Sequence, residues 1–554
     1  MRTILLFVFL LLSIKGHAAW AEKTLESMTL DEKIGQIFMI AGYVDPEYAV
    51  RETENPRVIE EIDTFIKEYY VGSIGLVGPS QAAKQVALLN RYQEMSKYPI
   101  LFAQDFEWGL SMRLTDGMRF PKNITLGALE DNSLIYQMGK EIGRQGKLVG
   151  VQMNFSPDMD VNVEPENPVI NVRSFGASPQ QVAAKGIAMI KGLQEADMIA
   201  SAKHFPGLGD ITSDPHLELP VNTRDRKRLE EVELYPFNEA VKAGVLSIQT
   251  DHVLMPALEP DTKLASSLSP RIVQGILKDK MGFQGVVISG ALRMKALSDT
   301  MPQEEIALKA FVAGSDLLLM PKDFPRAYMA IKTAILEGKI TPEALNERVL
   351  KILKLKEKSQ LHIKRLFEIP TEKELHTPEA IALKRKIYQT VVRVTKDENR
   401  ALPIVSTKNS HIAYVQISDA PTSIFYDAIK QELALDPFFI SLEQDEPSLI
   451  QQLEKYSQVI VAILPADPRR IAQIRLLNAQ KRVEELKHFR VHGLREPTVN
   501  LLKSLESINK KVTICYFGNP FGLQFVQSFS TLINAYEDDP EAQLAAANLL
   551  LGRT

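Results

Sequence analysis

The sequence predicts an α/β protein made of a (β/α)8 barrel of the TIM type and a second, smaller α/β domain. From about residue 30 to 355, short apolar runs rich in Val and Ile alternate with longer amphipathic stretches, as in repeated strand and helix units. These runs are apolar on both faces, which is typical of parallel strands covered by helices. The 554 residues exceed one ordinary domain, and the alternating region alone is long enough for one barrel.

Seven apolar runs are expected to form barrel strands. They cover residues 71–77, 99–105, 151–158, 198–205, 245–252, 285–290 and 315–321. The competing architecture is a doubly wound sheet with a phosphate-binding glycine loop. The glycines of GLG at 207–209 lack the G-x-G-x-x-G spacing of such a loop, so the barrel is favoured.

The N-terminal stretch is typical of a secretory signal peptide, expected at residues 1–21. A basic residue precedes an apolar core at 4–12, and Ala19 and Ala21 flank Trp20 in an A-x-A pattern that predicts cleavage after Ala21. The alternative is an uncleaved membrane anchor, but the apolar core is well short of the roughly 20 residues that span a bilayer. We therefore expect a secreted or periplasmic protein with no membrane span after cleavage.

The composition excludes several classes of function. A formal net charge of −4 gives no broad basic surface, so no nucleic-acid partner is expected. The only cysteine, Cys515, can form no disulfide within the chain. The sequence contains no H-E-x-x-H motif and no Cys-rich ligand set, and we expect neither a metal nor an organic cofactor.

The expected domains are a barrel at residues 22–357, a charged helical linker at 358–385, and a C-terminal α/β domain at 386–554. The C-terminal region again alternates strands with helices, its strand-like runs being HIAYVQI, QVIVAIL, KVTICYF and TLINAYE. Few polar residues follow these runs. We therefore expect the chemistry to lie in the barrel.

Polar side chains gather at the carboxyl ends of the expected barrel strands. They are Asp105, Asp158, the pair Lys203 and His204, and the pair Asp251 and His252. In a barrel these ends form the catalytic face. The alternative is that such residues cap the following helices, as Asp often does, but capping does not account for a Lys-His pair.

The loop after Lys203 and His204 carries Asp214 and His216 in a D-x-H arrangement. A carboxylate two residues from an imidazole can accept its N–H, fix the tautomer and raise the basicity of the ring. Such a pair can transfer protons. Taken alone the arrangement is weak, because any surface loop can hold Asp and His together.

Four motifs follow one another along the expected barrel: AQDFEWGLSMRL at 103–114, NPVINVRSFG at 167–176, KHFPGLGDITSDPH at 203–216 and GFQGVVISGALRMKA at 282–296. In this order they resemble the β-N-acetylhexosaminidase branch of glycoside hydrolase family 3, in the form found in Bacteroidetes-type members. The stretch VVRVTKDENRALPI resembles the opening of the family's C-terminal sandwich domain. The resemblance thus implies a TIM-type barrel followed by an α/β sandwich.

The resemblance implies a carbohydrate substrate, a terminal β-linked N-acetylglucosamine, most plausibly on peptidoglycan fragments. Position by position, the residues that would hold this sugar are Asp105, Arg113, Arg173, Lys203 and His204. A carboxylate and cationic donors can bracket sugar hydroxyls with charge-assisted hydrogen bonds.

The resemblance also implies that His216, oriented by Asp214, is the general acid/base of a retaining mechanism. Two departures lie in the same loop: Leu208 replaces a histidine of the family pattern, and Pro215 replaces a serine. Pro215 is expected to stiffen a loop that is mobile in relatives. A β-glucosidase of the same superfamily is a weaker alternative, because those enzymes lack the D-x-H loop.

A third departure concerns the nucleophile. Gly290 stands where the family has the aspartate that attacks the anomeric carbon, and a retaining glycosidase without it loses the covalent route. Three interpretations stay open. The protein is a pseudoenzyme that binds amino sugars; or Asp251, in a segment that usually reads T-A-H, supplies a relocated carboxylate; or the substrate's own acetamido group acts as nucleophile. Asp251 as a cap or an ion-pair partner is the alternative to the second.

Overall fold

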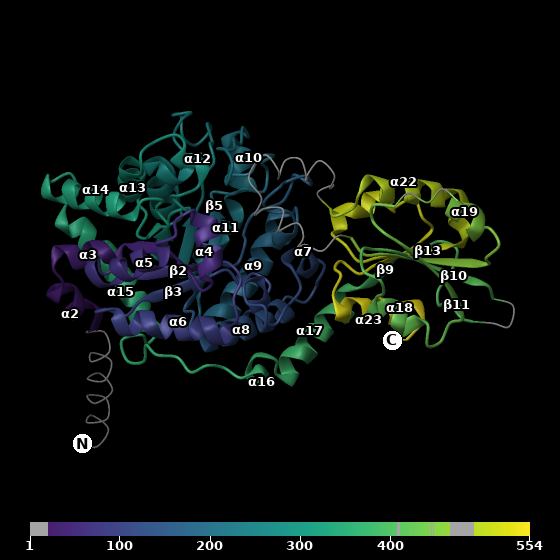
Figure 1. The fold of residues 1–554 in the computed structure, drawn as a ribbon. Coiled ribbons are helices and arrows are strands. Elements are labelled where there is room, and N and C mark those ends of the chain that lie inside the picture. Colours follow the sequence, from purple (N-terminus) through teal and green to yellow (C-terminus); the bar gives the residue numbers. More distant parts are fainter. Residues whose placement is uncertain (1–19, 407–409, 445, 447, 466–491, 554) are drawn as a thin grey trace, which may run out of the picture. The chain divides into compact units, whose positions relative to one another are not determined.

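The computed structural model describes residues 20–406, 410–444, 446, 448–465 and 492–553. The chain divides into two compact units (Figure 1). The first contains residues up to 120 and 131–377, and the second contains 121–130 and 378–554. Segment 121–130 therefore lies between two parts of the first unit in the sequence but belongs to the second unit.

The first unit is an eight-stranded parallel barrel, which confirms the predicted fold class. The strands run in sequence order around the sheet, and a parallel bridge between Ile288 and Leu317 joins its two edges. The strands are β1 (Phe38–Tyr43), β2 (Ser73–Val77), β3 (Leu101–Gln104), β4 (Met153–Asn154), β5 (Ile199–Phe205), β6 (Ser247–Thr250), β7 (Val286–Ile288) and β8 (Leu318–Leu319).

Helices follow the strands and alternate with them along the chain (Figure 1). Those of the first unit are α2 (Trp20–Ser27), α3 (Leu30–Gln36), α4 (Pro46–Thr53), α5 (Val58–Glu68), α6 (Ala82–Met95), α8 (Ser133–Leu148), α9 (Pro179–Glu195), α10 (Arg226–Glu231), α11 (Tyr235–Lys242), α12 (Lys295–Ser298), α13 (Gln303–Ala313), α14 (Phe324–Leu336), α15 (Pro342–Lys358) and α16 (Glu372–Leu375). Short 3-10 helices are η1 (Leu110–Met112), η2 (Asn171–Arg173) and η3 (Ser266–Leu268), and η4 (Arg271–Lys280) is a π-helix.

Each of the seven runs expected from the sequence contains a strand, but the sequence reasoning did not single out β1. Its residues Phe38, Met39 and Ile40 are almost fully buried, as both faces of a barrel strand must be. Polar Gly-Gln and Gly-Tyr pairs bracket this short apolar run and obscure its ends. Pairing with β2 on one side and β8 on the other makes β1 the closing strand.

The second unit is built on a six-stranded sheet. Its order is β11-β10-β12-β13-β14-β9, with β9 antiparallel and the other strands parallel. The strands are β9 (Arg393–Asp397), β10 (Ile412–Ile417), β11 (Leu435–Ile440), β12 (Gln458–Ile463), β13 (Val512–Tyr516) and β14 (Thr531–Asn534). The helices are α7 (Asn123–Leu126), α17 (Pro378–Val391), α18 (Ile424–Ile429), α19 (Ser448–Leu453), α22 (Glu496–Leu505), η5 (Glu506–Lys511), η6 (Pro520–Phe525) and α23 (Pro540–Leu550).

Helices cover both faces of this sheet, which confirms the predicted α/β sandwich. Val415 on β10 belongs to one core with Leu449 of α19 and Leu502 of α22. Tyr414, the neighbouring residue on β10, points the other way, and its ring lies 6.3 Å from the ring of Phe425 in α18. Alternate side chains of one strand thus reach two opposite helical layers.

The expected signal peptide lies largely outside the described residues, which begin at residue 20. Trp20 and Ala21, where cleavage is expected, belong to α2. Ala21 is fully buried, and the Trp20 ring lies 5.2 Å from the ring of His362. Among the described residues, no helix combines the length and the apolar character needed to cross a membrane.

Candidate active site

The carboxyl ends of β3 and β5 bring three of the predicted sugar-binding residues together. Asp105 directly follows β3, and Lys203 lies near the end of β5 with its Nζ 2.7 Å from Asp105 Oδ1. Arg113, just after η1, donates from Nη2 to Asp105 Oδ2 at 2.6 Å. One carboxylate is therefore held by two cations at the barrel end where chemistry is expected.

Glu107 joins this group, although sequence reasoning did not assign it. Its Oε1 lies 2.8 Å from Lys203 Nζ and 2.8 Å from Arg173 Nη2, and Arg173 Nε donates to Oε2 at 3.0 Å. The Glu107 side chain is 1% exposed. The signal that could have found it is its place in the D-x-E segment that already supplied Asp105.

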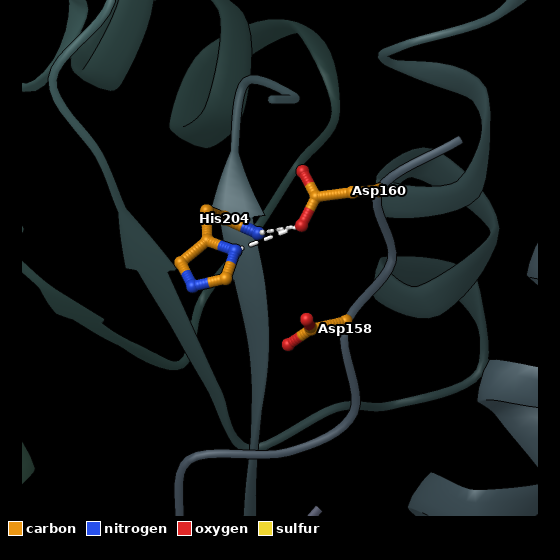
Figure 2. A group of neighbouring side chains, drawn as sticks. All are labelled: Asp158, Asp160 and His204. Atoms are coloured by element: carbon orange, nitrogen blue, oxygen red, sulfur yellow. Dashed lines mark hydrogen bonds and ion pairs between the residues drawn. The ribbon is translucent and has the colours of Figure 1, made fainter. Parts of the chain in front are cut away.

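His204 is held by Asp160, and Asp158 lies beside this pair (Figure 2). Asp160 Oδ2 accepts from the backbone N–H of His204 at 3.1 Å and lies 2.8 Å from its Nδ1. Arg173 Nη2 lies 3.3 Å from His204 Nε2, and Arg173 Nε lies 3.1 Å from Asp158 Oδ2. A guanidinium only donates, so this contact makes Nε2 the acceptor and Nδ1 the donor to Asp160.

The cations decide which acids of the cluster ionise. Burial opposes charge on Asp105, but Lys203 and Arg113 outweigh it and hold the pKa of that carboxyl well below its usual value. Burial likewise opposes charge on Glu107, while Arg173 and Lys203 lower its pKa to about 2. For Asp158 burial dominates, the Glu107 charge adds to it, and the pKa rises to about 7.

The acids in turn raise the pKa values of the basic groups. Burial would lower the pKa of Lys203, but Asp105, Glu107 and Asp158 raise it above its usual value. Burial also opposes charge on His204, and Asp160 and Asp158 raise its pKa. The cluster is thus an array of fixed charges whose donors and acceptors are set before a ligand arrives.

Asp158, Asp160 and His204 each place a potential ligand atom within 4.8 Å of the others, the spacing of a metal site (Figure 2). The donor set does not fit a metal. Arg173 and Lys203 already bring positive charge to Asp158, and both ring nitrogens of His204 are engaged by Asp160 and Arg173. A divalent cation would have to displace these cations.

His216 and Asp214, which the sequence suggests as a proton-transfer pair, contact each other. His216 Nδ1 lies 2.7 Å from Asp214 Oδ1, which also accepts the His216 backbone N–H at 2.9 Å. The His216 side chain is 62% exposed and Asp214 is 18% exposed. Asp214 therefore orients the ring through Nδ1 and leaves Nε2 on an accessible side chain.

A salt bridge closes the loop that carries this pair. Arg224 donates from Nε and Nη2 to the two oxygens of Asp210, at 2.6 and 3.2 Å. Arg228 Nη2 lies 3.8 Å from the same carboxylate. We call the salt bridge between Asp210 and Arg224 the clasp. The residues between its two ends, 211–223, include the whole D-x-H arrangement.

Gly290, where the family resemblance would place the nucleophile, follows β7 by two residues and lies against the imidazole of His252. A Cβ atom added to Gly290 would lie 2.6 Å from Cε1, 2.9 Å from Nε2 and 3.1 Å from Nδ1 of His252. His252 is fully buried. The volume that a side chain at 290 would need is therefore filled by a ring from the neighbouring strand end.

Asp251, the predicted substitute carboxylate, is 5% exposed. Its Oδ1 accepts the backbone N–H of His252 at 2.6 Å, and its own N–H continues the strand ladder to the Phe205 carbonyl at 2.8 Å. This contact joins the carboxylate to the next residue of the chain, and no helix begins there. By alternation Asp251 lies on the same side of β6 as Ser247, whose hydroxyl is 3.2 Å from Ser201 Oγ on β5.

Taken together, the strand ends offer two kinds of chemistry. The charged cluster can exchange parts of its internal hydrogen bonding for sugar hydroxyls, and the accessible imidazole of His216 can give or take a proton. His216 also acts electrostatically on His252: burial lowers the pKa of His252, the Asp251 charge opposes this, and His216 contributes to the lowering.

Comparison with known proteins gives one consistent family. The glycosyl hydrolase family 3 N-terminal domain matches residues 29–355. The chain is 28% identical over 418 residues to the β-N-acetylglucosaminidase/β-glucosidase of Cellulomonas fimi, covering 73% of this chain and 71% of that protein. It is 26% identical over 523 residues to β-hexosaminidase A of Pseudoalteromonas piscicida, covering 86% and 84%.

A solved structure agrees over nearly the whole length. The chain superposes with a TM-score of 0.76 on a glycoside hydrolase family 3 β-N-acetylglucosaminidase from Paenibacillus sp. str. FPU-7. The two are 28% identical, and the match covers 95% of this chain and 97% of that one. Both units are therefore found in one relative, in the same order.

Proposed function

Because the chain belongs to glycosyl hydrolase family 3, we propose that it is a β-N-acetylglucosaminidase-type glycosidase. Its substrate is a glycoside with a terminal β-linked N-acetylglucosamine. The names of the Cellulomonas and Pseudoalteromonas relatives support this substrate class. The sugar lies at the carboxyl ends of the barrel strands, where the charged cluster gathers.

The observation that carries the proposal is the hydrogen bond of 2.7 Å between His216 and Asp214. Retaining glycosidases need one group that protonates the leaving oxygen and later deprotonates water. With Nδ1 tied to the carboxylate, the Nε2 of His216 serves as that group, and its 62% exposed side chain can meet a glycosidic oxygen.

The charged cluster supplies binding. Asp105 accepts hydrogen bonds from sugar hydroxyls, while Arg113 and Lys203 donate to them from either side of that carboxylate. Arg173 and His204 complete the set on the β4 side of the cluster. Because these groups already pair with one another, little side-chain ordering remains when the sugar binds.

A second candidate function is an amino-sugar-binding protein whose hydrolysis is strongly impaired, and Gly290 favours it. The attacking carboxylate of the family is absent at that position, while every side chain of the charged cluster is present. Hydrolysis then depends on Asp251 or on the acetamido group of the substrate. The local hydrogen bond of Asp251 to the His252 N–H occupies one of its carboxylate oxygens.

We further propose export across the membrane by the N-terminal leader and a natural substrate among peptidoglycan fragments. The basic start, the short apolar core and the A-x-A pattern support export. Peptidoglycan fragments carry β-linked N-acetylglucosamine and are met outside the cytoplasm. Fractionation of the native host, with an antibody used to detect the protein, checks the export. Recovery of the protein together with cytoplasmic markers would refute the export.

The test of the function measures p-nitrophenol release from p-nitrophenyl N-acetyl-β-D-glucosaminide alongside calorimetric binding of N-acetylglucosamine. We expect binding, and a slow release that is lost in His216→Ala. Loss in Asp251→Asn as well would identify Asp251 as the relocated acid. Binding without release favours the second candidate, and neither binding nor release contradicts both. Faster release from the corresponding β-glucoside would instead support the β-glucosidase alternative.

A further inference from the structure

We infer that the leader is removed ahead of Trp20, at the bond between Ala18 and Ala19. The exported protein then keeps Trp20 and Ala21. The inference rests on the proposed export and deepens it, because it names the bond that is modified. It replaces the cut after Ala21 that the A-x-A pattern predicts, since the folded first unit uses both of the residues at 20 and 21.

Ala21 is buried in the folded first unit. Its exposed fraction is 0%, and it is the one buried residue of α2. The helix packs against α15, where Lys354 Nζ lies 3.1 Å from Glu22 Oε1. Burial of the Ala21 methyl group stabilises the fold only in a chain that still contains this residue. A cut after Ala21 would therefore remove the buried residue of the helix.

The ring of Trp20 lies against the segment that follows α15. Its centroid is 5.2 Å from the centroid of the His362 ring, and the two planes are inclined by 34°. Aromatic rings at this separation pack favourably, and a tryptophan brings a large apolar area to such a contact. Residues that a leader loses during export make no contacts in the folded protein. The packing of this ring is therefore expected only if Trp20 is retained.

The backbone N–H of Trp20 also has an acceptor. It donates to Glu357 Oε1 on α15 at 3.2 Å. The first N–H groups of a helix have no acceptor within the helix, so a carboxylate at this end satisfies one of them and interacts favourably with the helix dipole. A protein that begins at Glu22 lacks this hydrogen bond as well as the aromatic contact and the buried methyl group.

The sequence offers a suitable bond ahead of these residues. A leader is cut where small residues stand at the last position before the bond and two positions ahead of it. Gly16 and Ala18 meet this requirement for the bond after Ala18. His17 does not meet it for the next bond. Of the two bonds directly ahead of Trp20, the one after Ala18 is therefore the one with the required residues.

The step is hydrolysis of a peptide bond by a signal peptidase of the exporting membrane. Water adds its oxygen to the carbonyl carbon of Ala18, and the bond from that carbon to the nitrogen of Ala19 breaks. The nitrogen leaves with the electron pair and takes up a proton from the water. Nothing is oxidised or reduced, and the products are a carboxylate on Ala18 and an amino group on Ala19.

Two matched leader variants distinguish the two bonds. Gly16→Glu puts a charged residue two positions ahead of Ala18, and Ala19→Glu does the same for the cut after Ala21. Both positions precede the described residues. Intact mass and N-terminal sequencing are measured on protein expressed in the native host. We expect the wild type to begin at Ala19, the Ala19→Glu variant to be cut at the same bond, and Gly16→Glu to accumulate with its leader.

A wild-type protein that begins at any later residue would overturn the inference. A start at Glu22, together with a leader retained in Ala19→Glu and removed normally in Gly16→Glu, would restore the cut that the A-x-A pattern predicts.

The use of the two residues by the fold has a separate test. Proteins are released from a fusion partner so that they begin at Ala19 or at Glu22, and their Tm values are compared. The longer protein should have a Tm at least about 2 °C higher, because it keeps the ring and the buried methyl group. Lys23→Ala in the longer protein is the control, since Lys23 is exposed on α2 and its loss should leave the Tm nearly unchanged. Equal Tm values for the two starts would overturn the inference.

Neither measurement needs a substrate, so the inference and the proposed function fail separately. A full-length chain recovered with cytoplasmic markers would contradict both the export and the inference. A chain recovered outside the cytoplasm that begins at Glu22 would contradict the inference alone. Loss of p-nitrophenol release bears on the glycosidase proposal and changes neither the mass nor the Tm comparison.

Discussion

At the scale of single residues, Lys203 is the centre of the charged cluster. Its side chain is 2% exposed, and its Nζ lies 2.7 and 2.8 Å from the carboxylates of Asp105 and Glu107. No other side chain of the cluster contacts both of these acids in the described part of the chain. Its charge is therefore what allows two neighbouring carboxylates to stay ionised in a buried site.

Lys203→Met should lower the free energy of unfolding by about 3–5 kcal/mol, because it leaves buried acids without their cation. Binding of N-acetylglucosamine should be lost as well. Urea unfolding and calorimetry measure the two effects. The control is Lys140→Met, which removes an exposed pair with Glu195 and should leave both nearly unchanged. A Lys203→Met protein as stable as the wild type would refute the central role of Lys203.

Asp158 makes the stability of the folded protein depend on pH. Its carboxyl keeps its proton up to a pKa of about 7 in the folded protein, because burial and the Glu107 charge raise that pKa. An unfolded Asp ionises at about 3.9, so between these values the folded state binds the extra proton and stability falls as pH rises. The contribution is fully present below about pH 4 and lost above about pH 7.

Asp158→Asn should flatten the decline of Tm between about pH 4 and 7, since the amide does not titrate. His204, whose pKa is also raised above 6.5, adds a slope of the same sign that persists in this variant. Calorimetric scans of both proteins across this range measure the difference. Parallel curves would show that Asp158 does not hold the proton.

The residues of the candidate site could be predicted in part from the sequence. Asp105, Arg113, Arg173, Lys203 and His204 do lie together, because parallel strand ends meet at one edge of a barrel. Glu107 and Asp160 were not assigned, since each lies beyond a strand end where turns decide the direction of a side chain. The contact of His252 with Gly290 could not be predicted, because it depends on the ring's rotamer and on the two hydrogen bonds that select it.

At the scale of elements, the loop from Asp210 to Arg224 is the part most directly tied to proton transfer. Its clasp is a two-point salt bridge, and within the loop the chain turns at Asp214, whose carbonyl accepts from Leu217 N at 2.9 Å. Pro215 is buried, and its ring fixes the φ angle of the middle residue of the D-x-H arrangement. We infer that the clasp and the proline together restrict the positions open to His216.

Arg224→Ala should loosen this loop and leave the barrel intact. Backbone amides of residues 211–219 should then exchange hydrogen faster, as followed by mass spectrometry of peptides. The matched control is Arg226→Ala, which removes an exposed pair with Glu230 within α10. Unchanged exchange in Arg224→Ala would show that the loop keeps its shape without the clasp.

Strand positions were the most predictable elements. Seven of the apolar runs contain strands, because continuous Val and Ile runs favour a buried parallel sheet. β1 was not singled out, although its burial is as complete, because its apolar run is short and its ends are obscured. The D-x-H loop could be predicted as a motif, but its clasp joins residues 14 positions apart and needs the folded loop to be seen.

At the scale of the whole molecule, the sequence predicted two domains, while the insertion of 121–130 into the second unit was not predicted. Glu537, 6% exposed, holds this segment: its Oε1 accepts from Lys122 N at 2.7 Å and from Thr125 Oγ1 at 2.6 Å. Sequence periodicity follows only neighbouring residues. A contact between positions more than 400 residues apart has no local signal.

Glu537→Ala should lower the free energy of unfolding of the second unit by about 1–3 kcal/mol, because two buried donors lose their acceptor. Glu537→Gln, which keeps an acceptor oxygen, should cost less. Limited proteolysis should also cut within 121–130 more readily in the alanine variant. Identical unfolding curves for the alanine variant and the wild type would show that other contacts fix the segment.

We propose that the sugar-binding residues of this chain are in place while Gly290 leaves the nucleophile position without a carboxylate. The most direct measurement is p-nitrophenol release from p-nitrophenyl N-acetyl-β-D-glucosaminide by the wild type and by the Gly290→Asp variant, at saturating substrate. We predict that the variant is at least roughly a hundredfold faster, since covalent catalysis becomes possible again. A wild type as fast as the variant would contradict the proposal.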